Sequence, residues 1–284
     1  MSEDKPAGLD YRIFVPSKGR PQNMHRIQTL LPTATIVVAQ DEYHRYAMEV
    51  EAKNLVTHPG ASEGVVGLPS VYNWCIEHFD EATVIEADDD LENVFCWTGE
   101  GSRRNFKKMS DHRDILQIME NMVQLAEDLD ITAFGWTKSM NAAFAKMDHR
   151  PFHPVGLVSN VFGVRGAARR RPYDPAMIGR ASIDWTLRTL LKDRCVMIDK
   201  RVFFDCGKIF GGSGGNAGIV TSEKFRLSTE RLKETWGRHV RFGIDPNGAA
   251  KHKKLDAKGR TISGNQGDRQ VMMAVSRSNP AATR

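Results

Sequence analysis

Four short apolar runs in the first 90 residues alternate with segments of helical pattern, and the fourth run ends in three consecutive aspartates. The runs cover residues 11–15, 34–39, 54–58 and 82–87, with helices expected from 21 to about 31, over 42–52 and from 67 to about 79. This alternation is typical of a parallel sheet covered by helices on both faces. The sequence therefore predicts an α/β fold, in which ligands bind beyond the carboxyl ends of the strands.

The aspartates Asp88, Asp89 and Asp90 fall at such a strand end. Three adjacent carboxylates repel one another unless a cation shares them. Mg²⁺ and Mn²⁺ prefer oxygen ligands and leave coordination positions open for phosphate. The triplet therefore indicates a metal–diphosphate site. The alternative is a solvated acidic turn, which is the commoner identity of three aspartates without this context.

Other polar residues are expected at the same edge of the sheet. The loop after the first strand offers backbone donors, a hydroxyl and two cations, a combination that suits a nucleotide. It lacks the spacing of a P-loop, and its alternative identity is an ordinary turn. Asp41 and His58 follow the second and third strands, and Asp41 is expected to contact the base or the ribose. The predicted nucleotide-binding residues of these strand ends are Pro16, Ser17, Lys18, Arg20, Asp41, His58, Asp88 and Asp89.

The second half of the chain has a mixed pattern. Helices are expected over 114–129, from a Ser182 cap to residue 191, and over 222–236; strands are expected over 93–97, 131–136, 155–164, 195–198 and 201–204. The segment 98–112, rich in Gly, Arg and Lys, is expected to be a mobile loop. From residue 245 onward no periodicity is visible, which predicts an extended or partly disordered tail.

Charged side chains in this half suggest two further roles. Asp184 lies in the first turn of an expected helix, where it either stabilises the helix N-terminus or acts as a general base toward an acceptor hydroxyl. Two cationic clusters are either solvated surface or contacts to nucleic-acid phosphates. The candidate nucleic-acid-binding residues are Arg103, Arg104, Lys107, Lys108, Arg169, Arg170 and Arg171.

The charge of the chain is distributed unevenly. Residues 221–284 contain 14 Lys and Arg against 6 Asp and Glu, whereas the preceding 220 residues contain 26 against 29. A basic segment beside a near-neutral body suits a protein that approaches a polyanion. The four cysteines are far apart and are expected to be free thiols. No apolar stretch is long enough to span a bilayer, so we expect no membrane partner and a cytoplasmic location.

These features in this order resemble a glycosyltransferase of the GT-A fold, which has a nucleotide-binding half, an Asp-x-Asp turn and an acceptor half. The resemblance implies that Asp88 and Asp90 hold Mn²⁺ or Mg²⁺ and that Asp184 serves as the base. It also implies that the helix start from Gly67 to Asn73 approaches the nucleotide. The implied domain covers residues 9–240, with halves of 9–97 and 98–240, followed by a basic tail over 241–284.

More narrowly, residues 14–21 (Phe-Val-Pro-Ser-Lys-Gly-Arg-Pro) together with the acidic triplet resemble the TET-associated glycosyltransferases of bacteriophages. The resemblance implies transfer of a sugar from a nucleotide-diphosphate sugar, with a UDP-sugar expected, to the hydroxymethyl group of a modified pyrimidine in phage DNA. 5-Hydroxymethylcytosine is the expected base, and the infected bacterial cytoplasm the expected location. Three alternatives remain open: a non-DNA acceptor, a non-catalytic DNA-binding phage protein with a degenerate transferase fold, and a nucleotidyltransferase.

Overall fold

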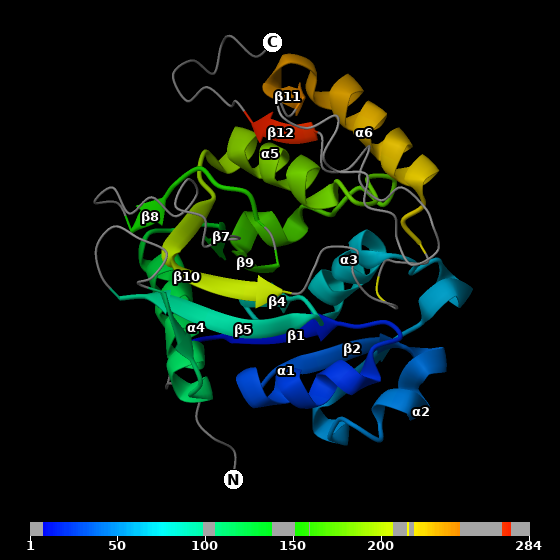
Figure 1. Ribbon diagram of the computed structural model, residues 1–284, viewed down its shortest axis with the longest axis vertical. Coiled ribbons are helices and arrows are strands. Elements are labelled where there is room, and N and C mark those ends of the chain that lie inside the picture. The colour runs from blue at the N-terminus through cyan, green and yellow to red at the C-terminus, as the bar shows by residue number, and fades with distance from the viewer. Residues whose placement is uncertain are drawn as a thin grey trace. The chain divides into compact units, whose positions relative to one another are not determined.

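The computed structural model describes residues 8–98, 106–137, 151–158, 160–206, 215, 219–244 and 269–273 (Figure 1). The chain divides into two compact units, Met1–Val220 and Thr221–Arg284, whereas the sequence pattern placed the division at residue 241. The first unit contains a large sheet and the helices that cover its two faces.

The four predicted N-terminal strands form the parallel part of the sheet. β1 (Tyr11–Pro16) lies between β2 (Thr35–Ala39) and β4 (Thr83–Ala87), and β3 (Leu55–His58) pairs with β2. All three pairings are parallel. The connections contain α1 (Met24–Leu30), α2 (Tyr43–Tyr46) and α3 (Leu68–His78). The predicted strand–helix alternation is confirmed for this half of the fold.

Beyond β4 the sheet becomes mixed, with the order β4-β9-β7-β10-β5-β6. Its strands are β5 (Leu91–Trp97), β6 (Phe106–Met109), β7 (Ala133–Thr137), β9 (Val161–Arg165) and β10 (Met197–Cys206), and β8 (Phe152–His153) pairs with β10. β9 runs antiparallel to both of its neighbours, whereas β10 runs parallel to β7 and antiparallel to β5. The predicted α/β class, with a mixed second half, is confirmed.

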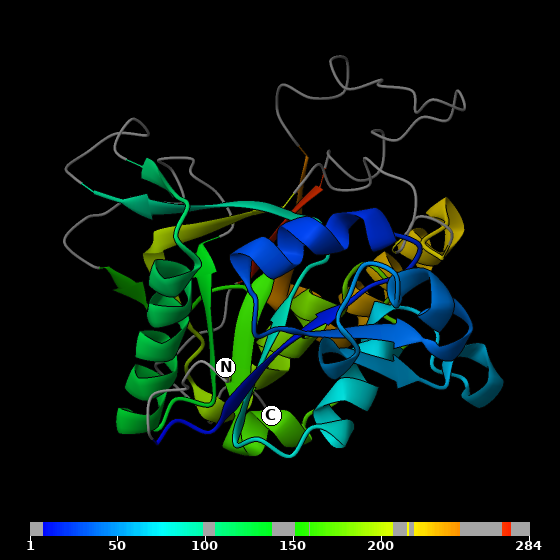
Figure 2. The ribbon, with the colours of Figure 1, turned by 90° about the horizontal axis from the view of Figure 1, so that it is seen from below.

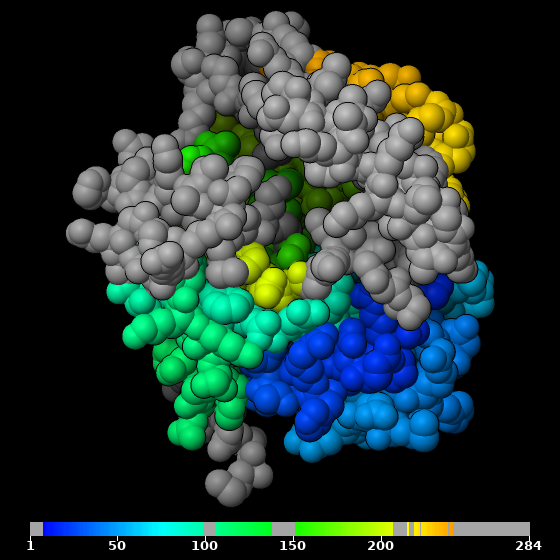
Figure 3. Space-filling view, viewed as in Figure 1, coloured from blue at the N-terminus to red at the C-terminus, as the bar shows by residue number. Residues whose placement is uncertain are grey.

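Alternating side chains of β1 show that helices cover both faces of the sheet. Ile13 and Val15 belong to one buried cluster with residues of α1 and of α4 (His112–Asp128). Phe14 points to the other face, where its ring lies 5.7 Å from that of Phe79, just after α3. On that same face, Trp185 of α5 (Ala181–Asp193) packs against Phe162 of β9. Figure 1 accordingly shows α1 and α4 below the sheet and α3 and α5 above it, and Figure 2 views α1 and α4 from below. The outer surfaces of α1 and α4 form the lower part of the face in Figure 3.

Several local expectations were wrong, each because of a contact that the local sequence does not reveal. The helix expected over 42–52 is only the single turn α2, because the chain then turns to bury Val50 in the core. Ser182 lies inside α5 and does not cap it, since the N–H of Asp184 already bonds to the carbonyl of Arg180. The segments expected as two strands near 195–204 form the one strand β10.

The expected loop over 98–112 and the expected tail also differ from the structure. Residues 106–109 of that loop form β6, which pairs with β5. In the second unit, α6 (Ser222–Trp236) matches its predicted bounds and is capped by the hydroxyl of Thr221, which accepts from the N–H of Lys224. β11 (Val240–Ile244) then pairs antiparallel with β12 (Arg269–Met273), so the segment expected to be an extended tail contributes a strand.

Candidate active site

The acidic triplet forms the turn between β4 and β5. The N–H of Asp88 bonds to the carbonyl of Asn160, at 2.9 Å, and the carbonyl of Asp88 accepts from the N–H of Leu91, at 3.3 Å. Asp89 is buried, whereas Asp88 and Asp90 are half-buried. The triplet is thus held by the adjacent strand β9 and is not a convex surface turn.

Asp89 joins the acidic turn to the loop after β1. Its carboxylate accepts from Ser17 Oγ at 2.7 Å and from Arg20 Nη1 at 2.6 Å, and Asn23 Nδ2 donates to its backbone carbonyl at 3.0 Å. Arg20 Nη1 also lies 3.2 Å from Asp90 Oδ2. Burial lowers the pKa of the Arg20 guanidinium, but the charges of Asp89 and Asp90 outweigh it and raise that pKa. Asp89 therefore positions the loop and leaves the other two aspartates to face a ligand.

Tyr46 completes this junction and was not predicted from the sequence. Its buried hydroxyl lies 2.7 Å from Ser17 Oγ and accepts from the N–H of Arg20 at 2.9 Å. Glu42 accepts from the N–H of Gly19 at 3.0 Å. An isolated tyrosine in a helical segment gives no sequence signal of such a role, because only the tertiary fold brings α2 against the loop.

A pocket of about 490 Å³ opens at the carboxyl ends of β1, β2, β3 and β4. Its lining combines the polar loop and the acidic turn with apolar side chains that include Val65, Val66, Leu68 and Val71. All but one of the residues predicted to bind the nucleotide line it. The lining includes Pro16, Ser17, Lys18, Arg20, Asp41, His58, Asp88, Asp89 and Asp90 from the predicted set, together with Glu42, Val65, Val66, Leu68, Val71, Asn160, Gly179, Cys206, Gly215 and Ile219.

The predicted residue that this pocket lacks is Asn73. Its amide instead donates to the carbonyl of Tyr173 at 2.9 Å and accepts from the N–H of Tyr173 at 2.7 Å. Asn73 therefore ties α3 to the segment before α5. The physical reason is its place on the helix: Val71 faces the pocket, and a residue two positions further along points elsewhere.

His58 lies at the bottom of the pocket wall formed by β3. Its Nδ1 accepts a hydrogen bond from the N–H of Gly60 at 3.1 Å, so the neutral ring carries its proton on Nε2. Burial lowers the pKa of His58, and the nearby charge of Lys18 acts in the same direction, while Asp41 opposes them. The imidazole is therefore a neutral hydrogen-bond donor toward the pocket at physiological pH.

Asp88, Asp90 and Cys206 form a group able to hold a metal ion. One ligand atom from each lies within 4.8 Å of the other two. Burial raises the pKa of the Asp88 carboxyl, and the charges of Asp90 and Asp89 raise it further. The pKa of Asp90 is raised as well, by burial and then by Asp89. Burial and the charge of Asp88 also raise the pKa of the Cys206 thiol. A divalent cation would offset the repulsion that causes these shifts.

A β-bulge places Cys206 beside the acidic turn. Along β10, Asp205 pairs with Asn93, but Cys206 pairs with Leu91, so one residue of β5 is skipped. Bulges of this kind re-aim a side chain and are common next to active sites. The spacing of the four cysteines does not distinguish the one at the end of β10, so Cys206 was predicted only to be a free thiol.

Asp184 lies outside the pocket lining. The residue is 3% exposed, and its carboxylate pairs with Arg188, one turn later on α5, at 2.8 Å. Gly179, five residues earlier in the chain, does line the pocket. The structure thus places Asp184 on a helix whose approach borders the site, with its carboxylate turned into an ion pair.

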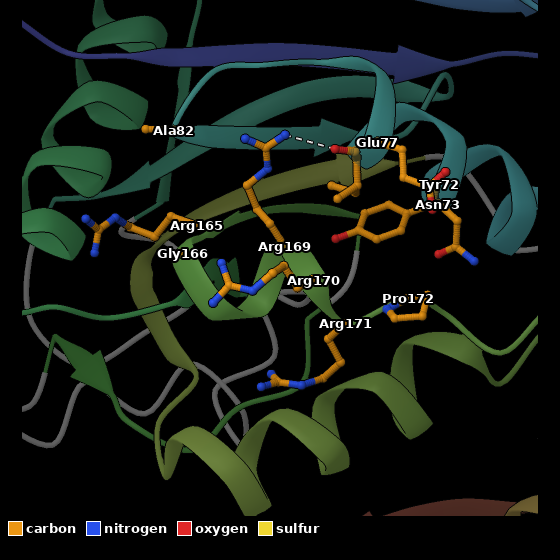
Figure 4. Close-up of a pocket in the computed structure, with 11 residues that line it drawn as sticks. Tyr72, Asn73, Glu77, Ala82, Arg165, Gly166, Arg169, Arg170, Arg171 and Pro172 are labelled. Carbon is orange, nitrogen blue, oxygen red and sulfur yellow. Dashed lines mark hydrogen bonds between the residues drawn. The ribbon is translucent and has the colours of Figure 1, made fainter.

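A second pocket, of about 660 Å³ and shown in Figure 4, is bordered by Arg169, Arg170 and Arg171, three of the arginines predicted to contact DNA. This pocket includes Ala82, which precedes β4, whereas the acidic turn follows β4. At about 3.3 Å per residue the two sites are roughly 20 Å apart, at opposite ends of that strand. Figure 4 shows the guanidinium groups of Arg165, Arg169, Arg170 and Arg171 diverging from one another. They do not converge on a single anion site.

Two of these arginines, which were predicted to contact phosphates, have partners within the protein. Arg169 donates to the carbonyls of Ile76, Phe79 and Glu81 and so closes the carboxyl end of α3. Arg171 is buried, and its guanidinium binds Asp193 at 2.9 and 3.1 Å. Arg170 is exposed and remains available to a partner.

The other predicted cationic cluster is only partly described. Arg103 and Arg104 lie outside the described residues. Lys107 and Lys108 are exposed neighbours on β6, the edge strand, so their side chains point to opposite faces of the sheet. Lysines on an edge strand also discourage pairing with another chain. This gives Lys107 and Lys108 a structural explanation in addition to the predicted phosphate contacts.

A match to a protein-family model shows the family to which this chain belongs. Residues 11–215 match the TET-associated glycosyltransferase model, which is more than two thirds of the chain and includes β1, the loop after it and the acidic turn. The protein is thus a glycosyltransferase with the α/β fold expected from its sequence. It belongs to the TET-associated glycosyltransferase family. No curated protein sequence matches it.

Several solved glycosyltransferase structures are similar to this chain at low sequence identity. Glucosyl-3-phosphoglycerate synthase from Mycobacterium tuberculosis, in complex with phosphoglyceric acid, is 11% identical with a TM-score of 0.49, covering 83% of this chain and 84% of that one. The mannosyltransferase PcManGT from Pyrobaculum calidifontis, in complex with GDP-Man and Mn²⁺, is 12% identical with a TM-score of 0.42. That match covers 69% of this chain and only 61% of the mannosyltransferase. The family assignment rests on the sequence match and not on these distant similarities.

Among the described residues, none of the helices combines the length and the apolar character needed to cross a bilayer.

Proposed function

We propose that this protein transfers a sugar from a nucleotide-diphosphate sugar to the hydroxymethyl group of a modified pyrimidine in DNA, with 5-hydroxymethylcytosine as the expected base. One observation carries the donor half of this proposal. The half-buried carboxylates of Asp88 and Asp90 share a single pocket with the cations Lys18 and Arg20, at the carboxyl ends of four parallel strands. That arrangement suits a diphosphate bound through a divalent metal ion.

The donor set fits Mn²⁺ or Mg²⁺. Asp88 and Asp90 provide oxygen ligands, and Cys206 provides a third atom within 4.8 Å of both. A divalent ion bound there neutralises negative charge that develops on the departing diphosphate. Arg20 is held against Asp89 at 2.6 Å, so its guanidinium is fixed beside the phosphate position before the donor binds. Such preorganised charge lowers the barrier without any rearrangement during the reaction.

The rest of the pocket suits the nucleoside. Asp41 offers an exposed carboxylate and His58 a neutral donor, at the end of the pocket formed by β2 and β3. The apolar wall of Val65, Val66 and Leu68 provides a surface against which a base and ribose can pack. A UDP-sugar is the proposed donor.

Asp184 stays the proposed base for the acceptor hydroxyl, as the resemblance implied. It acts in this role if the bound acceptor replaces Arg188 as its partner, because its carboxylate is buried and ion-paired at 2.8 Å. The Asp184→Asn variant tests the role. A base predicts loss of turnover with unchanged donor affinity, whereas a purely structural pair predicts loss of stability instead.

The DNA acceptor is supported by the name of the family and by exposed cations outside the pocket. Lys107, Lys108 and Arg170 are exposed and able to contact phosphates. In a duplex, the target base must leave the stack, at a cost of a few kcal/mol, before it reaches a pocket of this kind.

The decisive experiment is direct. The protein is incubated with hydroxymethylated DNA and a panel of nucleotide sugars, and the digested nucleosides are weighed by mass spectrometry. A mass increase equal to one sugar, with release of a nucleoside diphosphate and dependence on a divalent ion, supports the proposal. Release of pyrophosphate would indicate nucleotidyl transfer. A non-catalytic protein would show neither product, with or without EDTA. Unmodified DNA is the control substrate.

A non-DNA acceptor is the second candidate, and one observation favours it. Arg169 and Arg171, two of the cations expected to meet DNA, are engaged within the protein. Salt dependence separates the two candidates. Binding through several phosphate contacts should weaken steeply as the salt concentration rises, with a slope of about −0.9 per contact in a log–log plot for duplex DNA. A flat response with DNA would favour another acceptor.

A further inference from the structure

We propose that Cys206 is the third protein ligand of the catalytic metal ion and makes the site prefer Mn²⁺ and similar transition-metal ions over Mg²⁺. This inference rests on the proposed function, which requires a divalent ion at Asp88 and Asp90 but does not say which ion. Among the described residues that line the pocket, the one histidine is His58. It lies on β3, which β2 and β1 separate from β4 and the acidic turn, so it is not placed to be the third ligand.

The geometry allows one ion to reach all three residues. Two ligands of the same ion can be separated by at most the sum of their bond lengths, which is about 4.4 Å for a sulfur at ~2.3 Å and a carboxylate oxygen at ~2.1 Å. The ligand atoms of Asp88, Asp90 and Cys206 lie within 4.8 Å of one another. Because three ligands spaced equally around one ion at these bond lengths lie at most about 3.8 Å apart, a closing movement on the order of 1 Å brings the three atoms to bonding distance.

Independent contacts indicate that a cation belongs here. The carboxylate of Asp88 accepts no hydrogen bond from any described side chain, although it lies half-buried at the pocket. On the other side of the turn, the guanidinium of Arg20 already balances Asp89 and approaches Asp90 at 3.2 Å. Among the described residues, Arg20 thus pairs directly with Asp89 and Asp90, whereas its charge acts on Asp88 without a direct ion pair.

Asn160 gives the sulfur the surroundings of a metal ligand. Its side chain hydrogen-bonds to the thiol of Cys206, and its carbonyl accepts from the N–H of Asp88. Hydrogen bonds from neighbouring residues to the ligands of a metal ion orient those ligands and tune the affinity of the site for the ion. The β-bulge at Asp205 and Cys206 supplies the same orientation from the strand side.

The chemistry of sulfur then decides which ion is preferred. Mg²⁺ requires a near-ideal octahedron of oxygen ligands, whereas Co²⁺ and Zn²⁺ bind more tightly along the first-row affinity series and accept softer ligands. Mn²⁺ is the first member of that series and is less strict than Mg²⁺, so it tolerates one sulfur among oxygen ligands. When a thiol coordinates an ion, its S–H bond breaks, the proton passes to solvent and the electron pair stays on sulfur for the new bond. A serine at this position would offer an oxygen and remove the preference.

The first test uses Co²⁺ as a spectroscopic probe of the wild-type protein. A sulfur-to-cobalt charge-transfer band in the near ultraviolet, lost in Cys206→Ser and kept in Cys96→Ser, is the expected result. Cys96 is a matched control because it is also half-buried but lies on β5, outside the pocket. Co²⁺ that binds the wild type without the band would overturn the proposal.

The second test measures affinity by calorimetry. We expect the ratio of Mn²⁺ to Mg²⁺ affinity to fall at least ~10-fold in Cys206→Ser, the order of effect seen when metal-site partners are removed. An unchanged ratio would count against the role of Cys206. If Cys206→Ser does not fold, alkylation of Cys206 in the wild type gives the answer: Mn²⁺ should slow it and Mg²⁺ should not, and equal or absent protection would refute the proposal.

These outcomes are separate from those of the proposed function. A wild type that transfers sugar with Mn²⁺ or Mg²⁺ but shows no cobalt–thiolate band keeps the function and loses the role of Cys206. A protein that binds no divalent ion, in the wild type and in Cys206→Ser alike, loses the metal-dependent function and this inference together.

Discussion

Arg20 Nη1 lies 2.6 Å from Asp89 Oδ1, and this ion pair joins the loop after β1 to the acidic turn after β4. Both side chains are largely buried, with 14% and 8% of their surfaces exposed. The pair connects residues 69 positions apart in the sequence and holds the guanidinium of Arg20 beside Asp90, 3.2 Å from its carboxylate. The middle aspartate of the triplet is therefore structural, while its neighbours face the pocket.

Breaking this pair should destabilise the protein strongly. Arg20→Ala leaves the carboxylate of Asp89 buried without its partner, which costs roughly 3–5 kcal/mol in comparable pairs. The matched control is Arg113→Ala, because Arg113 is 83% exposed and only 3.8 Å from Asp111, and should cost less than about 1 kcal/mol. Urea unfolding of both variants measures the difference, and equal losses would contradict the role given to Arg20.

The outer aspartates should be needed for turnover and dispensable for folding. Asp88→Asn and Asp90→Asn each remove a metal ligand, so transfer should fall below detection. Their unfolding midpoints should stay at or above that of the wild type, because each substitution relieves repulsion within the triplet. Sugar transfer and thermal unfolding are measured on the same samples. Wild-type rates in both variants would refute the assignment.

Gly215 should be required for the position of Arg20. A Cβ at residue 215 would lie 3.1 Å from Cζ of Arg20, and the N–H of Gly215 donates to the carbonyl of Lys18 at 2.7 Å. Gly215→Ala should therefore weaken donor binding. Gly166→Ala is the matched control, with φ of +53° against +54° and no atom within 4 Å of its Cβ. Both variants carry the same backbone strain, so only donor affinity, measured by calorimetry, separates them. Equal donor affinity in the two would argue against the contact.

His58 should make stability depend on pH below neutrality. Its pKa in the folded protein is lowered from the ordinary value of 6.5, chiefly by burial, so folding favours the neutral ring. The stability from this group is complete above pH 6.5 and is lost as the pH falls through the lowered pKa. The melting temperature of the wild type should thus drop more steeply between pH 7 and 5 than that of His58→Asn, which still accepts from the N–H of Gly60. Parallel curves would contradict this; His25→Gln, at an exposed histidine, is the control.

Arg169 and Arg170 should separate stability from DNA binding. Arg169→Ala leaves three carbonyls at the end of α3 without their donor and should cost about 1–3 kcal/mol, with no change in the salt dependence of DNA binding. Arg170→Ala should leave stability unchanged, since the side chain is exposed, and reduce the salt slope by about 1 if it contacts a phosphate. Urea unfolding and DNA titrations at several salt concentrations measure the two effects. The reverse pattern would show that the assignment of the two arginines is wrong.

The sequence alone predicted much of the fold and the location of the site. Apolar runs of strand length, separated by helical segments, place Ser17, Asp41, His58 and Asp88 at one edge of a parallel sheet, because every parallel strand ends at the same side. α3 and α6 also begin within one residue of their predicted starts, at residues 67 and 222. The acidic triplet was interpreted as a metal-binding turn because three adjacent carboxylates are unusual at the end of a strand.

Only the tertiary structure decided which residues share a contact across long separations in the chain. Tyr46, Asn160 and Cys206 carry no local signal, and each reaches the acidic turn or its loop through another strand or helix. Asn73 and Arg169 carried a plausible signal but face other partners, because the rotation of a helix and the packing of a loop are set by the core. Composition and periodicity fix which edge of a sheet binds a ligand; side-chain packing fixes which atoms meet there.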